Sequence, residues 1–301
     1  MSTLYSHQTS NIRKTWFLIS FFFLLIIFIG WVLSYIYESP LILYIAVIFS
    51  FFTSFYSYWY SDKLVIRMTG AKEADPRQYR ELHRIVENLA ITAGLPKPRV
   101  FVVNEPQPNA FATGRNPEHG VVAVTTGILE KLDKSELEGV LAHELAHIGN
   151  RDMFVSTVTV VFAGTLAIVS DIVIRSLFWG SRKRDNNTNP AVYAIGLIVI
   201  LLAPLAATLI RLAVSRKREF LADATGALIT RYPEGLASAL EKIASDQHNM
   251  KSAKTATAHL YISNPFKGKK GQNFITKMFM THPSTQERIV ALREMDMSQY
   301  T

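Results

Sequence analysis

Charged residues are absent from four stretches of the chain, and this pattern predicts how the chain is organised. The stretches span residues 16–37, 40–60, 153–170 and 190–210. Each has the roughly 18–20 residues that an apolar α-helix needs to cross the core of a bilayer. We therefore expect four hydrophobic helical segments, arranged as two hairpins with polar regions after each.

The first two stretches predict a transmembrane hairpin over residues 1–60. Residues 38–40 are long enough only for a turn, and the second stretch ends in Tyr58, Trp59 and Tyr60, as is typical of the headgroup level. The first stretch is longer than the apolar part of a secretory signal and ends without small residues, so we expect it to be retained. Lys and Arg flank the hairpin and are absent from its turn, which predicts that both flanks are cytoplasmic.

The second hairpin, residues 153–214, is less regular. Its first helix continues into Asp171 and Arg175, which share one helical face and are expected to pair. The loop at residues 181–184 is strongly basic, which opposes the positive-inside rule if the hairpin spans. Two interpretations stay open: a spanning hairpin, or a shallow or protein-buried one. We favour spanning because the last stretch holds 21 uncharged residues, and either version returns the chain to the side it left.

The polar regions, residues 61–152 and 215–301, predict two halves of one folded domain. A helix is expected from the cap at Asp75 to Gly94, and a second one from Ser135, where serine precedes glutamate by three residues in a capping-box pattern. Short apolar runs separated by Pro and Gly predict antiparallel strands at residues 99–103, 109–113 and 121–125. The expected fold class is mainly α with a small antiparallel β-sheet.

Composition supports a membrane protein. Hydrophobic residues make up 49% of the chain and charged residues 19%, against a usual charged share of about 25%. These values exclude a collagen, a disordered chain and a disulfide scaffold. The net charge of +8 gathers beside the hydrophobic stretches and near the C-terminus, which favours anionic lipid over nucleic acid as the partner. With no cysteine, histidine and carboxylate are the strong metal ligands available.

A candidate metal site lies in the helix expected from Ser135. His143 and His147 are four residues apart, so both imidazoles can reach a single Zn²⁺ from one helical face. Glu144 projects beside that ion and is placed to take a proton from the attacking water and deliver it to the leaving amine. The alternative is a helix with two ordinary surface or core histidines. The position of the motif on a well-defined helix favours the metal site.

A catalytic zinc needs a third protein ligand and one open position. Glu219 is the best candidate, and Asp223 lies one helical turn after it. Asp223 is expected to accept the second ring N–H of a zinc histidine and so to fix its tautomer. An ordinary solvated acidic pair is the alternative. The returning hairpin favours the metal site, because it brings Glu219 back to the place where the histidine helix ends.

The order of these features resembles that of the HtpX-type membrane zinc metalloproteases, relatives of the CAAX prenyl endopeptidases. The motif His-Glu-x-x-His comes first, a hydrophobic hairpin follows, and the motif Glu-x-x-x-Asp comes last. The resemblance covers nearly the whole chain, including the first hairpin. It implies a gluzincin-like fold with one Zn²⁺ per chain, and peptide or protein substrates, chiefly membrane proteins. It also implies a multi-pass protein of the bacterial plasma membrane, with a cytoplasmic catalytic domain and a role in quality control under stress.

The resemblance extends to three further residues. In such proteases a strand carrying Asn-Ala-Phe borders the cleft and pairs with the substrate backbone, which implies a substrate-binding role for Asn109. Spacing alone would make Asn109 a turn residue. His282 and Arg288 lie in what looks like the closing motif of the family, where His282 is expected to donate to the oxyanion and Arg288 to anchor the site. A structural capping role is the alternative for both.

Two other functions stay open. One is a dedicated processing protease that acts at prenylated C-termini, although those enzymes have more spans than the two that precede this motif. The other is a non-catalytic adaptor that retains zinc as a structural element. Structural zinc usually has four protein ligands, and only three are nominated here.

Overall fold

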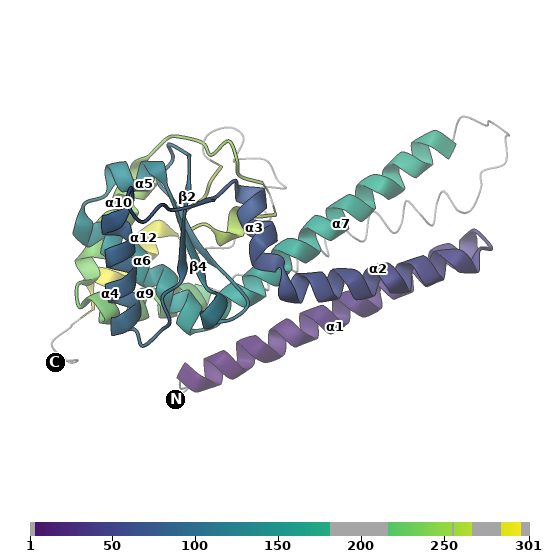
Figure 1. The fold of residues 1–301 in the computed structure, drawn as a ribbon, viewed down its shortest axis with the longest axis horizontal. Coiled ribbons are helices and arrows are strands. Elements are labelled where there is room, and N and C mark those ends of the chain that lie inside the picture. The colour runs from purple at the N-terminus through teal and green to yellow at the C-terminus, as the bar shows by residue number, and fades with distance from the viewer. Residues whose placement is uncertain (1–3, 181–215, 255, 267–283, 296–301) are drawn as a thin grey trace.

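The structure, a computed structural model, describes residues 4–180, 216–254, 256–266 and 284–295. Three long helices extend together from a body of shorter helices around one sheet (Figure 1). They are α1 (Leu4–Ile36), α2 (Pro40–Trp59) and α7 (Asp152–Gly180). The body contains α3 (Ser61–Thr69), β1 (Lys72–Glu73), α4 (Arg80–Thr92), β2 (Arg99–Val103), β3 (Ala110–Thr113), η1 (Pro117–His119), β4 (Val121–Thr125), α5 (Thr126–Lys131), α6 (Lys134–Gly149), α9 (Arg216–Thr230), α10 (Pro233–Ser245), η2 (Ala258–Leu260) and α12 (Thr285–Arg293).

The first expected hairpin is formed by α1 and α2. Within the described ranges, Thr9–Tyr35 and Pro40–Trp59 are the two helices long and apolar enough to cross a bilayer. Their contact requires Gly30, because a Cβ there would collide with the Cβ of Ala46. Many large apolar side chains on both helices are exposed, as expected of surfaces that face acyl chains.

Helix α7 covers the third hydrophobic stretch and lies along α1. The two helices share an apolar core in which Phe22 of α1 stacks on Phe162 of α7, with ring centroids 4.0 Å apart. The N-terminal hairpin is thereby fixed to the start of α7, where the body ends. The basic loop at residues 181–184 and the fourth stretch at residues 190–210 lie outside the described part of the chain, and so do the side chains of Asp171 and Arg175, which were expected to pair.

The sheet has the strand order β1-β2-β4-β3 and is mixed. The expectation of a purely antiparallel sheet was wrong: β2 and β4 run parallel, whereas β1–β2 and β3–β4 are antiparallel. The reason is that β4, after its hairpin with β3, pairs on its other side with β2. Its five residues, Val121–Thr125, are all buried, as expected of a central strand whose two faces are covered.

The cap of helix α6 lies two residues earlier than expected. The cap is Asp133, whose carboxylate accepts the backbone N–H of Glu136 while the Glu136 side chain accepts the N–H of Asp133. Ser135 donates its hydroxyl to Asp133 instead. The predicted Ser135 cap was therefore wrong by two residues. Similarly, the helix expected from Asp75 begins only at Arg80.

The two polar regions form one core. Buried side chains from the first region, such as Val86 and Leu141, pack in one cluster with Leu236, Leu240 and Leu292 from the second. Helices α6 and α9 are therefore neighbours, although the second hydrophobic hairpin separates them in the sequence.

Candidate metal centre

Two imidazoles from α6 face each other at the centre of the site. The Nε2 atoms of His143 and His147 are 3.2 Å apart, and the two rings are nearly perpendicular. His143 is 1% exposed, and the His147 side chain is 16% exposed. The i, i+4 spacing on one helix therefore brings both nitrogens to one point, as the sequence pattern predicted.

Helix α9 brings a carboxylate to the same point. Glu219 Oε1 lies 3.6 Å from His147 Nε2, and Oε2 lies 4.0 Å from His143 Nε2. One ligand atom from each of the three residues falls within 4.8 Å of the other two. This approach depends on Gly226, where a Cβ would lie 2.9 Å from the backbone nitrogen of His143.

These three donors fit a zinc ion. Bond lengths of about 2.0–2.1 Å and tetrahedral angles imply nitrogen atoms about 3.3 Å apart, close to the separation of the two Nε2 atoms. Two imidazoles and one carboxylate leave one position open, which is the arrangement of a catalytic rather than a structural zinc.

An acidic and a basic residue hold the second ring nitrogen of His143, Nδ1, which points away from His147. Its Nδ1 lies 2.9 Å from Asp223 Oδ1. Arg288 donates two hydrogen bonds to Asp223, from Nε (2.8 Å) and Nη2 (2.6 Å), and its Nη1 lies 3.7 Å from Glu219 Oε2. All of these side chains are buried, so the Arg288 cation offsets the two carboxylates inside the protein.

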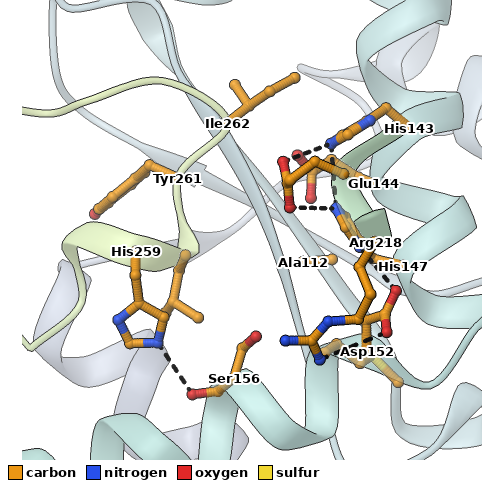
Figure 2. A pocket seen from close by; sticks show the side chains of 13 residues that line it. Ala112, His143, Glu144, His147, Asp152, Ser156, Arg218, His259, Tyr261 and Ile262 are labelled. Carbon is orange, nitrogen blue, oxygen red and sulfur yellow. Dashed lines mark hydrogen bonds and ion pairs between the residues drawn. The ribbon is translucent and has the colours of Figure 1, made fainter. Parts of the chain in front are cut away.

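The outer nitrogen of His147 faces a residue that sequence reasoning missed. Asp152 Oδ2 lies 3.3 Å from His147 Nδ1 (Figure 2). Arg218 Nη1 lies 3.7 Å from Asp152 Oδ1, and the Asn11 amide donates to the same oxygen at 2.6 Å. An acidic residue five positions after the second histidine was the available signal for Asp152. Nothing in the sequence pointed to Asn11.

The surroundings shift the pKa values of His143, His147 and Glu144 in different directions. Burial and the Arg288 cation lower the pKa of His143 to about 4. Burial also opposes a charge on His147, but the hydrogen bond to Asp152 and the charge of Glu219 outweigh it and raise its pKa to about 9. Burial raises the pKa of Glu144 to about 7, which suits a group that must accept and release a proton near neutral pH.

The site lines a small, partly open cavity of about 30 Å³. This is room for one or two waters but not for a peptide residue. Figure 2 shows the segment with His259, Tyr261 and Ile262 across the cavity from His143 and Glu144. In the position seen here, this segment leaves no room for a peptide residue beside His143 and Glu144.

The same segment accounts for Asn109. Its amide donates to the Ser263 carbonyl (2.9 Å), its carbonyl oxygen accepts the Ser263 N–H (3.2 Å), and the side chain is buried away from the cavity. The neighbouring Ile262 N–H donates to the Ala110 carbonyl (3.0 Å). Asn109 thus ties the chain's own segment to the edge of β3 instead of lying free for substrate.

The structure describes all but one of the predicted site residues. His143, Glu144, His147, Glu219, Asp223 and Arg288 come together at one site. His282 lies outside the described residues. His259, for which no spacing suggested a role, lines the cavity and contacts the Ser156 carbonyl at 3.3 Å.

The fold and this site define a metallopeptidase of the His-Glu-x-x-His type that is bound to a membrane. Residues 76–296 match Peptidase family M48, and the chain belongs to that family. It is 45% identical over 300 residues to the Protease HtpX homolog of Caldanaerobacter subterraneus subsp. tengcongensis, a match that covers 97% of this chain and 98% of that one. It is 48% identical over 255 residues to the homolog of Pyrococcus furiosus, covering 84% and 86% of the two chains.

A solved structure shares the fold. Ste24p from S. mikatae superposes with a TM-score of 0.50 and 18% identity, over 95% of this chain and 66% of that one. This similarity concerns the fold alone. Together with the family match, it confirms the resemblance inferred from the sequence and the mainly helical architecture.

Proposed function

We propose that this chain is a zinc-dependent endopeptidase that cleaves membrane proteins and misfolded proteins at the cytoplasmic face of a bacterial plasma membrane. Its place would be in membrane-protein quality control under stress. The observation that carries the proposal is the buried cluster of His143, His147 and Glu219 with Glu144 beside it. The names of the relatives, which are proteases, support it.

Three side chains would hold one Zn²⁺ per chain: His143 and His147 through Nε2, and Glu219 through its carboxylate. The chemistry supplied by the bound ion would be Lewis acidity towards the scissile carbonyl and towards water. Asp223 and Asp152 would each accept the outer N–H of one imidazole, which fixes the ring tautomers and directions.

Glu144 would transfer protons. Its raised pKa lets it take a proton from the attacking water and then give that proton to the amine that leaves when the C–N bond breaks. Arg288 keeps Asp223 ionised and lowers the cost of several buried carboxylates in one place. The small volume of the cavity limits the amount of bulk water around these groups.

The test compares three variants of the purified full chain in detergent. Glu144→Gln should keep one zinc per chain and lose cleavage of an unfolded protein by about 10²–10⁴-fold. Glu219→Gln should lose both zinc and cleavage. Glu138→Gln, on the same helix but without a place in the cavity, should behave as the parent chain. Zinc is counted by elemental analysis and cleavage by gel. Full activity of Glu144→Gln, or unchanged zinc in Glu219→Gln, would refute the mechanism.

The fold shared with Ste24p keeps a dedicated processing protease as a second candidate. Cleavage of a non-prenylated, unfolded membrane protein at a rate similar to that of a prenylated peptide would exclude it. A non-catalytic adaptor is disfavoured because the described residues bring together three ligands, not the four of structural zinc.

A further inference from the structure

A polar residue of the N-terminal hairpin reaches the metal centre. Asn11 lies in α1, five residues before the first uncharged stretch, and is 3% exposed. Its amide donates one hydrogen bond to Asp152 Oδ1 (2.6 Å) and another to the Asn150 carbonyl (3.1 Å). Both acceptors lie at the junction between α6 and α7. The first residues of the chain thus contact the helix that carries the metal-binding histidines.

Asp152 connects Asn11 with His147. One oxygen of Asp152 accepts from Asn11, and the other lies 3.3 Å from His147 Nδ1. Arg218 Nη1 lies 3.7 Å from the first oxygen, where it contributes charge but is too distant for a directed hydrogen bond. The Asn11 amide therefore sets the rotation of the Asp152 carboxylate, and the carboxylate in turn sets the direction of the His147 ring.

Packing holds Asn11 in this place. One turn further along α1, Thr15 donates its hydroxyl to the Asn11 carbonyl (2.9 Å). Beyond it, Leu18 and Phe22 are buried against α7, in the same cluster as Phe154, whose residue lies two positions after Asp152. The α1–α7 contact thus fixes the distance between Asn11 and Asp152.

We propose that Asn11 is a positioning residue of the metal centre, so that the N-terminal membrane hairpin orients the ligand His147 through Asp152 as well as anchoring the chain. Partners of a metal-bound histidine typically change metal affinity by about 10–100-fold when removed, because the ring loses its fixed tautomer and direction. Asn11 acts one contact further out, so its removal should fall at the lower end of that range. This inference rests on the proposed zinc site.

The experiment measures metal affinity in the full-length chain, with Glu144→Gln as the parent to prevent self-cleavage. Zn²⁺ affinity is measured by competition with a chromophoric chelator, and Co²⁺ absorption reports the geometry of the site. Asn11→Ala should weaken Zn²⁺ binding by about tenfold and alter the Co²⁺ spectrum, while the stoichiometry at saturation stays the same. Ser20→Ala, at an exposed position further along the same helix and away from the Asn11 contact, should bind Zn²⁺ as the parent does.

A double-mutant cycle tests the route through Asp152. If Asn11 acts through that carboxylate, Asn11→Ala combined with Asp152→Ala should bind Zn²⁺ no more weakly than Asp152→Ala alone. Additive losses would overturn the proposal, as would parental affinity in Asn11→Ala. A parent chain that binds no Zn²⁺ would refute the proposed zinc site itself, which is a distinct result.

A reciprocal exchange separates positioning from simple packing. Asn11→Asp keeps the shape of the side chain but places a second carboxylate against Asp152, so Zn²⁺ binding should weaken more than in Asn11→Ala. Adding Asp152→Asn restores one donor and one acceptor between the two side chains and leaves an oxygen for His147. The double exchange should recover part of the lost affinity and the parental Co²⁺ spectrum. No recovery would show that Asn11 only fills space at the end of α6.

Discussion

At the scale of single residues, Arg288 is the buried cation on which the site depends. It is 2% exposed, it donates both hydrogen bonds to Asp223, and it lies near Glu219. Without it, two carboxylates would remain in a region that excludes water. Its contribution is therefore to stability and to the charge balance of the ligands together.

Replacing Arg288 with Met should destabilise the chain by about 3–5 kcal/mol, because the carboxylate of Asp223 loses its buried partner. Arg288→Lys should cost less but still lower the melting temperature, since an ammonium group cannot make the two-pronged contact. The measurement is thermal unfolding in detergent. Arg293→Met provides the control on the same helix, because that pair with Glu234 is exposed and should change little. Equal effects at both positions would contradict this account.

Spacing along the chain was enough to predict the residues that share a helix. His143 with His147, and Glu219 with Asp223, lie four apart on α6 and α9 respectively, and a single helix turn brings each pair together. Asn11 and Asp152 could not be paired in this way, because their contact depends on how α1 packs against α7. The contact of Asn109 with Ser263 could not be predicted for a related reason: Ser263 lies in a distant segment with no pattern of its own.

At the scale of elements, the close approach of α9 to α6 brings Glu219 to the two histidines of the proposed ligand set. Gly226→Ala should push α9 away from His143 and weaken Zn²⁺ binding, although no ligand is changed, since the new Cβ would lie 2.9 Å from a backbone atom. Roughly tenfold weaker binding is expected, comparable to the loss of an outer partner of a ligand. Gly149→Ala is the matched control because its Cβ would meet only side-chain atoms at 3.6–3.7 Å. Chelator competition measures both variants, and equal affinities would contradict the importance of this contact.

A second inter-element contact predicts a pH dependence. Asp246, at the end of α10, accepts from Lys131 at the end of α5 (2.9 Å) and from the His248 N–H (2.9 Å). Burial favours a neutral Asp246, but these two donors outweigh it and lower its pKa. A lowered pKa in the folded state means that the stabilisation is complete above the unfolded value near 4 and is lost as the pH falls below it.

Asp246→Asn should therefore lower stability by about 1 kcal/mol at neutral pH, a figure reduced for the partial exposure of Lys131. The difference from the parent chain should persist at about pH 5 and shrink towards about pH 3. Melting temperatures of both chains across this range provide the check. Because both chains carry the same metal site, acid effects on that site cancel in the comparison. A difference that grows on acidification would contradict the assignment.

The boundaries and the pairing of the elements show what local sequence patterns cannot predict. Apolar runs and turn residues located three of the four strands and missed the two-residue strand β1, and they carry no information on which strand pairs with which. The insertion of β4 between β2 and β3 is decided by burial of both faces of the sheet. The cap of α6 shows the same limit on a smaller scale, because Asp133 and Ser135 both offer capping oxygens and only the geometry of the preceding turn selects Asp133.

At the scale of the whole molecule, the orientation in the membrane can be tested because the chain has no cysteine. Single cysteines at Glu38, Ser181 and His248 would report the hairpin turn, the basic loop and the body. An impermeant maleimide added to intact cells should label the Glu38→Cys variant, and His248→Cys only after the membrane is opened. Ser181→Cys should react from outside if the second hairpin spans. Labelling of His248→Cys in intact cells would reverse the proposed orientation.

The order of the ligands along the chain also has a consequence for biosynthesis. A ribosome makes His143 and His147 first, then the whole second hydrophobic hairpin, and only then Glu219. On the proposed ligand set, a nascent or prematurely terminated chain that ends before Glu219 lacks one donor and cannot hold the ion as the finished chain does. Proteolytic capacity would thus arise only after both hydrophobic hairpins have been synthesised, and unfinished copies would not digest themselves or their neighbours during insertion.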